Sequence, residues 1–228
     1  RSVEVRELLM PRFFCTEPIQ PGARFALDAR VAQHVRVLRL REGEAIVLFD
    51  GRGGEVPATL EKIDKREAVV ATSAHVAVER ESPRPVTLYA ALIANDRMDW
   101  MIQKATELGV AAIQPMLSER SQRIPGDVDK RVEHWCGVAI AACEQCGRNR
   151  IPEIHAPIVL ADAVAKTQPH STILLDADGD ATLTAIESSC AVFVGPEGGF
   201  SPQELKLLRE HCTSKLRVGF TVLRAETA

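Results

Sequence analysis

Residues 190–205 read C-A-V-F-V-G-P-E-G-G-F-S-P-Q-E-L and predict a strand, a glycine-rich loop and a helix in succession. The run Ala191–Val194 is short, apolar and rich in β-branched and aromatic residues, which is typical of a strand buried on both faces. A Gly-Pro pair ends it. The Ser-Pro pair at 201–202, followed by Glu204, is the signature of a capped helix that begins at Pro202. A loop in this position lies at the carboxyl end of a strand, where open α/β sheets bind ligands.

Three glycines make the loop between strand and helix unusual. Gly195, Gly198 and Gly199 remove side chains where a ligand could approach the backbone, and they permit positive φ. The alternative is a tight turn that binds nothing, since glycine loops are common connections. The loop matches neither G-x-G-x-x-G nor the P-loop pattern, so it does not indicate a dinucleotide or ATP.

The composition is that of a globular protein. Of 228 residues, 46% are hydrophobic and 26% are charged, which suits one large or two small domains. No apolar run approaches the ~20 residues of a membrane span, and we expect no membrane partner. Residues 1–9 lack a signal-peptide core, and M-P-R-F-F at 10–14 resembles a natural start, so residues 1–9 are expected to be an upstream extension or a cloning remnant. The net charge of −3 restricts any nucleic-acid surface to a local patch.

Six cysteines without paired spacing predict reduced thiols. Cys143 and Cys146, with Cys136 and His134 upstream, are compatible with a zinc site. A second Cys-x-x-Cys is missing, and one helical pattern accounts for all four residues. We therefore expect no metal.

Short strands dominate the first third of the chain. They are expected at 24–27, 45–49 and 67–71, with one helix at 31–38. This pattern predicts a small β-barrel or sandwich, a size that suits a binding module. The arginines around the helix form either a solvated charged face or a patch that contacts phosphates: Arg30, Arg36, Arg39 and Arg41. R-E-S-P-R-P at 80–85 predicts a linker.

Beyond the linker, strands alternate with helices. Strands are expected at 86–93, 110–117, 172–175, 191–194 and 216–219, and helices at about 98–108, 128–146 and 202–212. Met98, Met101, Ile102, Ala105 and Leu108 give the first of these helices one apolar face, and Gly109 ends it. This alternation predicts βαβ units and a buried parallel sheet.

Arginines follow several of these elements. Arg97, Arg120 and Arg224 come after strands, and Arg148 and Arg150 follow the long helix. Because these loops lie beyond strands or a helix end that could converge, we predict that these arginines and Arg123 gather at one rim. Guanidinium groups bind phosphates and stack on unpaired bases. Any one arginine alone is more often a surface residue, and it is the cluster that favours a binding role. The sequence contains neither G-x-S-x-G nor H-E-x-x-H, and its six histidines are scattered. Any chemistry is therefore expected to depend on a bound reactive cofactor and on positioning.

Seven motifs carry a resemblance that covers residue 10 to the end. They are M-P-R-F-F at 10–14, D-R-M-D at 96–99, I-Q-K-A-T-E-L-G-V at 102–110, S-E-R-S at 118–121, E-Q at 144–145, V-G-P-E-G-G-F-S at 194–201 and V-L-R-A-E-T-A at 222–228. Together they resemble the ribosomal small subunit methyltransferase E family, which belongs to the SPOUT methyltransferases. The chain departs from the family at Ala94, where relatives usually carry lysine.

The resemblance implies an α/β fold. A PUA-like RNA-binding β-barrel at 10–80 would precede a SPOUT methyltransferase domain at 81–228, whose carboxyl end forms a trefoil knot. It further implies a cytoplasmic homodimer that uses S-adenosylmethionine to methylate N3 of a uridine in 16S rRNA of the small ribosomal subunit. The competing hypothesis is a non-catalytic RNA-binding or ribosome-assembly protein. A nucleotide-dependent α/β enzyme is disfavoured because the Rossmann and P-loop signatures are missing.

The resemblance also implies residue roles. The expected cofactor-binding residues are Leu174, Leu175, Gly195, Pro196, Glu197, Gly198, Gly199, Val218, Gly219, Val222, Leu223 and Arg224. The expected catalytic residues are Arg97, Arg120 and Glu197, with the glutamate as a base or a cofactor contact. The expected RNA contacts are Arg12, Arg36, Arg39, Arg97, Arg120, Arg123 and Arg148.

Overall fold

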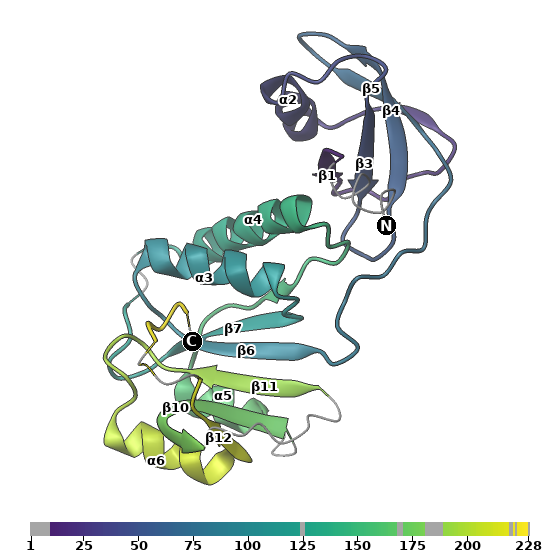
Figure 1. Ribbon diagram of the computed structural model, residues 1–228. Helices are drawn as coiled ribbons and strands as arrows, with labels where there is room; N and C mark the ends of the chain where they lie inside the picture. The colour runs from purple at the N-terminus through teal and green to yellow at the C-terminus, as the bar shows by residue number, and fades with distance from the viewer. Residues whose placement is uncertain are drawn as a thin grey trace. The chain divides into compact units, whose positions relative to one another are not determined.

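The computed structural model describes residues 10–123, 126–167, 171–180, 189–218, 221 and 223–227. The chain divides into two compact units (Figure 1). The first comprises the residues up to Glu81 together with Ile140–Ile151, and the second comprises Ser82–Ala139 and the residues from Pro152 onward. No helix in the described ranges is long and apolar enough to cross a membrane.

The first unit is built on one five-stranded sheet in the order β1-β3-β4-β5-β2. The strands are β1 Arg12–Phe14, β2 Arg24–Ala26, β3 Ala45–Phe49, β4 Val56–Ile63 and β5 Ala68–Thr72. Helix α2, Ala29–Val37, packs Val31 and Val35 into a core with Phe13, Ile46 and Leu60. The predicted small β-domain with one helix is therefore confirmed, as a single sheet rather than a sandwich.

The second unit contains a parallel sheet in the order β12-β10-β11-β6-β7-β8, with β9 paired to β7. The strands are β6 Val86–Ala91, β7 Ala112–Leu117, β8 Glu153–Ile154, β9 Ile158–Val159, β10 Thr172–Asp180, β11 Cys190–Val194 and β12 Ser214–Leu216. The helices are α3 Asn95–Glu107, α5 Leu160–Lys166 and α6 Pro202–His211, and α4 Val128–Cys146 begins in this unit. Among the described residues, every strand pairing in this sheet is parallel, as the strand–helix alternation predicts.

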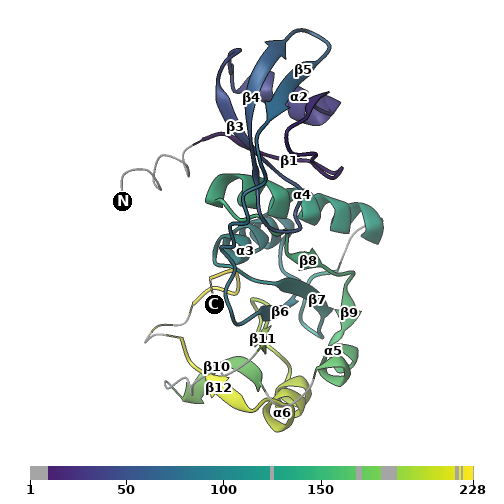
Figure 2. The ribbon, with the colours of Figure 1, turned by 90° about the vertical axis from the view of Figure 1, so that its right-hand side faces the viewer.

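The two faces of this sheet carry different helices (Figure 2). Tyr89 of β6 stacks on Phe193 of β11 with ring centroids 4.8 Å apart, and Phe193 belongs to a core that includes residues of α5 and α6. The preceding residue on each strand points to the other face of the sheet. These residues, Leu88 and Val192, line a cavity together with side chains of α3. The alternation along each strand therefore separates two layers of helices.

The predicted apolar face of α3 is only partly correct. Met98, Met101 and Ile102 are buried, but Leu108 is 87% exposed. Leu108 is the C-cap, and Gly109 follows it with a φ of +92°. The turn that ends the helix carries Leu108 away from the core.

Candidate functional site

Three loops of the second unit meet at one edge of the sheet. Strands β11, β6 and β7 are parallel neighbours, so their carboxyl ends share this edge. The loop after β7 is tied to the end of β6 by a 2.9 Å hydrogen bond from the Gln122 backbone N–H to the Leu92 carbonyl. The glycine loop, residues 195–201, follows β11 at the same edge.

The glycine loop is a turn whose backbone is open on one side. Gly199 has a φ of +67° and donates a 2.9 Å hydrogen bond to the Pro196 carbonyl. Glu197 and Gly198 are exposed, and their backbone N–H groups have no hydrogen-bond partner among the described residues. Unpaired backbone donors and the space left by Gly198 are what a polar ligand needs in order to lie against the main chain.

Arg97 stands at this edge in the first turn of α3. Its Nη1 lies 3.3 Å from Oε1 of Glu197, and the same oxygen lies 3.4 Å from the Ala94 backbone nitrogen. The Arg97 side chain is 41% exposed and that of Glu197 is 30% exposed, so solvent screens the pair while leaving both within reach of a ligand.

Arg120, from the loop after β7, contacts the glycine loop directly. Its Nη1 donates a 3.0 Å hydrogen bond to the carbonyl oxygen of Gly198. A side chain at Gly198 would meet Arg120 at ordinary contact distance, with the added Cβ 3.5 Å from the Cβ of Arg120. Arg97 and Arg120 thus both contact one loop, so the structure brings these two residues of the predicted rim together.

Helix α6 begins with the predicted capping box. The Ser201 side chain accepts a hydrogen bond from the Glu204 backbone, and Oε2 of Glu204 accepts one of 2.9 Å from the Ser201 N–H. The other oxygen of Glu204 accepts a 2.8 Å hydrogen bond from the Glu119 backbone N–H. One carboxylate therefore caps the helix and holds the loop after β7 beside it.

The carboxyl-terminal segment reaches the same cluster. Residues 225–227 form a turn, with a 2.9 Å hydrogen bond from the Thr227 N–H to the Arg224 carbonyl. Oε1 of Glu226 lies 4.0 Å from Nε of Arg97 and 4.0 Å from Nη1 of Arg224. Arg224 itself is mostly exposed, at 78% of its side chain.

A cavity of about 540 Å³ lies between α3 and the strands β6 and β11. Its lining is largely apolar and includes Trp100, Val192 and Val194, and it also includes Glu226. Of the glycine loop only Gly195 borders it. Because the other predicted cofactor residues do not line it, we do not assign this cavity to the cofactor.

The remaining predicted cofactor residues differ in position. Leu174 is fully buried in the core of β10, so its side chain packs against protein, while Leu175 is half-buried opposite Leu216 of β12. Val218 is 41% exposed and Leu223 is half-buried. Gly219 and Val222 lie outside the described residues.

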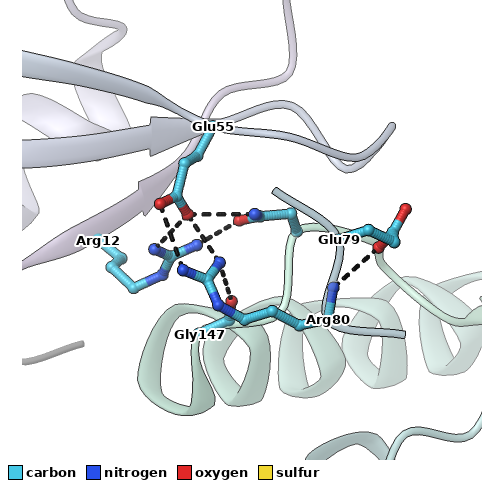
Figure 3. Close-up of polar contacts among 6 residues, drawn as sticks. Arg12, Glu55, Glu79, Arg80 and Gly147 are labelled. Carbon is cyan, nitrogen blue, oxygen red and sulfur yellow. Dashed lines mark hydrogen bonds and ion pairs between the residues drawn. The ribbon is translucent and has the colours of Figure 1, made fainter. Parts of the chain in front are cut away.

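Two arginines predicted to contact RNA are buried in the first unit instead. Arg12 is 4% exposed, and its Nη1 pairs with Oε2 of Glu55 at 2.9 Å (Figure 3). Its Nη2 donates to the side chain of Asn149. Arg148 is 5% exposed and pairs with Glu81 through a 3.0 Å hydrogen bond from Nε. These guanidinium groups are engaged within the first unit, which argues against the predicted phosphate contacts.

Glu55 is the centre of this buried network. Burial raises the pKa of Glu55, but hydrogen bonds from Arg80, Arg12 and Asn149 outweigh burial and lower that pKa from 4.5 to about 2. Arg80 also donates a 3.2 Å hydrogen bond to the Gly147 carbonyl (Figure 3). The network joins β1, the beginning of β4, the linker and the end of α4.

The other predicted RNA contacts are more accessible. Arg36 is half-buried, with Nη1 3.4 Å from the carbonyl oxygen of Asp64, and Arg39 is exposed. Arg123 is exposed on the loop after β7. Arg39 adopts a φ of +55° just beyond the end of α2, which turns the chain out of the helix.

The Cys-x-x-Cys pair lies in α4. Cys143 is fully buried, its Sγ lies 3.5 Å from the Arg150 carbonyl, and burial raises the pKa of its thiol to about 12. Zinc ligation requires a thiolate, which this environment disfavours. Within the described ranges, no three His, Cys, Asp or Glu side chains are placed to hold a metal ion.

Sequence reasoning missed Glu55, the approach of Glu226 to Arg97, and the second contact of the capping residue Glu204. Glu55 and the contact from Glu204 to the loop after β7 have no local sequence signal, because their partners are distant in the chain. Glu226 stands two positions after Arg224, a spacing that indicates a local charge pair but not its approach to Arg97.

Known proteins resemble this chain in sequence and in structure. The family model described as an RNA methyltransferase domain matches residues 80–228, and the one described as an RNA methyltransferase PUA domain matches residues 27–72. Ribosomal RNA small subunit methyltransferase E from Aquifex aeolicus is 32% identical over 86% of this chain and 86% of its own. The relative of the same name from Synechocystis is 31% identical, and the match covers 85% of this chain but 65% of that longer protein.

A solved structure agrees with these sequence matches. It is a ribosomal RNA small subunit methyltransferase E from Neisseria gonorrhoeae bound to S-adenosyl methionine. It superposes with a TM-score of 0.89 at 35% identity and covers 96% of this chain and 93% of its own. The chain therefore belongs to the ribosomal RNA small subunit methyltransferase E family.

Proposed function

We propose that this chain transfers a methyl group from S-adenosylmethionine to N3 of a uridine in 16S rRNA of the small ribosomal subunit. The observation that carries the proposal is the convergence of Arg97, Arg120 and the exposed glycine loop at one edge of the sheet. Family membership supports it, as does the relative that was crystallised with S-adenosyl methionine.

The glycine loop is the part of the chain that fits the cofactor. When bound, S-adenosylmethionine supplies a methyl group on a positively charged sulfur, which a nucleophile can accept. The exposed backbone of Glu197 and Gly198, with its unpaired N–H groups in the described chain, offers donors to such a ligand. The residues that would hold it are Leu174, Leu175, Gly195, Pro196, Glu197, Gly198, Gly199, Val218, Gly219, Val222, Leu223 and Arg224.

The arginines stabilise the charge that develops on the uracil ring. N3 carries a proton, and where this proton leaves ahead of the new N–C bond, negative charge spreads from N3 to the two ring carbonyl oxygens. The bond between sulfur and methyl would break as the N–C bond forms, and the sulfur would leave as a neutral thioether. Arg97 and Arg120 each contact the glycine loop, so their charges would already lie beside an anion that develops there. Glu197 anchors Arg97 and is the candidate acceptor for the N3 proton.

The first unit supplies RNA affinity in this proposal. We assign residues 10–80 to the RNA-binding domain and 81–228 to the methyltransferase domain, with Arg36 and Arg39 as phosphate contacts beside Arg97, Arg120 and Arg123 of the site. The protein acts as a homodimer in the cytoplasm, where its ribosomal substrate is assembled. Sedimentation analysis tests the dimer.

Mass spectrometry of digested rRNA tests the function. Small subunits from cells that lack the modification are incubated with the protein and S-adenosylmethionine that carries a deuterated methyl group. We expect labelled 3-methyluridine at one position of 16S rRNA, and a loss of at least about tenfold in rate for Arg97→Gln, which removes the charge. RNA binding without transfer of label would favour the non-catalytic assembly protein instead.

Glu197→Gln separates the two roles of the glutamate. A proton acceptor predicts that this variant loses turnover and the rise in rate with pH. A variant that keeps full turnover with the wild-type pH dependence would exclude Glu197 as the base.

A further inference from the structure

Glu226 combines burial with incomplete pairing. Its side chain is 10% exposed, and its Oε2 has no hydrogen-bond partner within the described part of the chain. A buried carboxylate oxygen without a partner is costly, because the group loses its water without a compensating hydrogen bond. A protein retains such a costly group where a nearby positive charge stabilises it or where the function of the protein requires it.

Two guanidinium groups face the other oxygen of Glu226. Nε of Arg97 and Nη1 of Arg224 each lie 4.0 Å from Oε1. These distances permit attraction between charges but are too long for direct hydrogen bonds. Contacts of this length in active sites commonly tighten when the substrate binds.

Arg97 is consequently held from two sides. Oε1 of Glu197 accepts a 3.3 Å hydrogen bond from Nη1 of Arg97, and the carboxylate of Glu226 faces Nε. Nη2 of Arg97 has no hydrogen-bond partner among the described residues. The two carboxylates come from segments that are distant in sequence, the glycine loop and the turn at 225–227. They restrict the rotation of the guanidinium and leave one donor edge for an anion.

We propose that Glu226 is a positioning residue that orients Arg97 toward the developing uracil anion. This inference rests on the proposed function. Glu226 acts through Arg97 and does not touch the reacting atoms. A misplaced charge near the reaction centre costs rate far more than it costs cofactor affinity, since the anion exists only in the transition state.

Glu226→Gln is the central variant because it removes the charge and keeps the size. We expect kcat to fall by roughly tenfold to a hundredfold, with the Kd for S-adenosylmethionine unchanged within about twofold. Glu226→Asp should restore part of the rate. Glu210→Gln, which removes an exposed carboxylate paired with Lys206 on α6, is the matched control and should change neither quantity.

A double-mutant cycle distinguishes positioning from a general structural effect. In an Arg97→Gln background, Glu226→Gln should cause no further loss of kcat, because its target is already absent. An equal loss in both backgrounds would overturn the proposal, and so would an unchanged kcat in Glu226→Gln alone.

A spectroscopic measurement gives a readout that does not depend on activity. The Nε–H resonance of Arg97, identified by its disappearance in Arg97→Gln, should shift in Glu226→Gln and stay in place in Glu210→Gln. If this resonance did not shift in Glu226→Gln, Glu226 would not hold Arg97, and the proposal would be overturned. If the wild-type protein transferred no methyl group, the proposed function would fail, while this resonance would still decide whether Glu226 holds Arg97.

Discussion

Arg120 and Gly198 join two loops of the site through a single hydrogen bond, 3.0 Å from Nη1 to the glycine carbonyl oxygen. The side chain of Arg120 also lies along the space that a side chain at Gly198 would enter. The position of this arginine and the shape of the glycine loop therefore depend on each other.

The glycines of the loop should differ in their tolerance of alanine. Gly198→Ala should change the free energy of unfolding by less than about 0.5 kcal/mol, because the added Cβ would make only ordinary contact with Arg120. Gly199→Ala should cost about 1–2 kcal/mol, since its φ of +67° is strained for any residue with a Cβ. Urea denaturation measures both. A larger loss for Gly198→Ala would contradict this account of the loop.

The cap of α6 should contribute measurably to stability. Ser201→Ala removes the side-chain acceptor of the capping box and should destabilise the protein by about 1 kcal/mol. Gln203→Ala, at an exposed position in the same turn, is the control and should have little effect. Thermal unfolding of both variants tests the cap. If Ser201→Ala melted at the same temperature as Gln203→Ala, the cap would not be a stabilising element.

Local signals predicted the elements that surround the site. The sequence from Ala191 to Glu204 contains the strand, the break and the cap within a few residues, and each is confirmed. Strand β4 was missed because Pro57 interrupts its beginning and Glu61-Lys62 dilutes the apolar pattern at its end. The short strands β1, β8 and β9 depend on pairing with distant strands and have no pattern of their own.

The family and the two-domain α/β class are confirmed by the matches to known proteins. The trefoil knot stays a prediction, since Gly219, Phe220 and Val222 lie outside the described residues. The roles of the site residues also stay predictions. The order of residues along the chain was enough to place Arg97 and Arg120 after strands. It could not show that Glu197 and Glu226 contact Arg97, because these residues come together only when distant parts of the chain fold against each other.

The buried carboxylate of Glu55 should make the free energy of unfolding depend on pH in the acid range. Its pKa is lowered in the folded protein to about 2, so its contribution is complete above the ordinary value of 4.5 and is lost as the pH falls from there toward 2. Glu55→Gln should therefore cost about 3–5 kcal/mol at pH 7, because Arg12 and Arg80 lose their shared counter-charge.

The difference between the wild type and Glu55→Gln should shrink as the pH is lowered through this window. Urea denaturation at a series of pH values measures it. Glu61→Gln, which breaks an exposed pair with Arg24, is the control and should behave like the wild type throughout. A difference for Glu55→Gln that stayed constant from pH 7 to pH 3 would show that the charge of this residue does not stabilise the fold.

Calorimetric titration of S-adenosylmethionine tests most directly whether the glycine loop holds the cofactor. The account predicts saturable binding by the wild type and by Gly137→Ala, a helix position with open space around it. It predicts at least about tenfold weaker binding by Gly198→Val, whose branched side chain would cover the exposed backbone beside Arg120. Wild-type protein that bound no S-adenosylmethionine, or Gly198→Val that bound it as tightly as the wild type, would contradict the account.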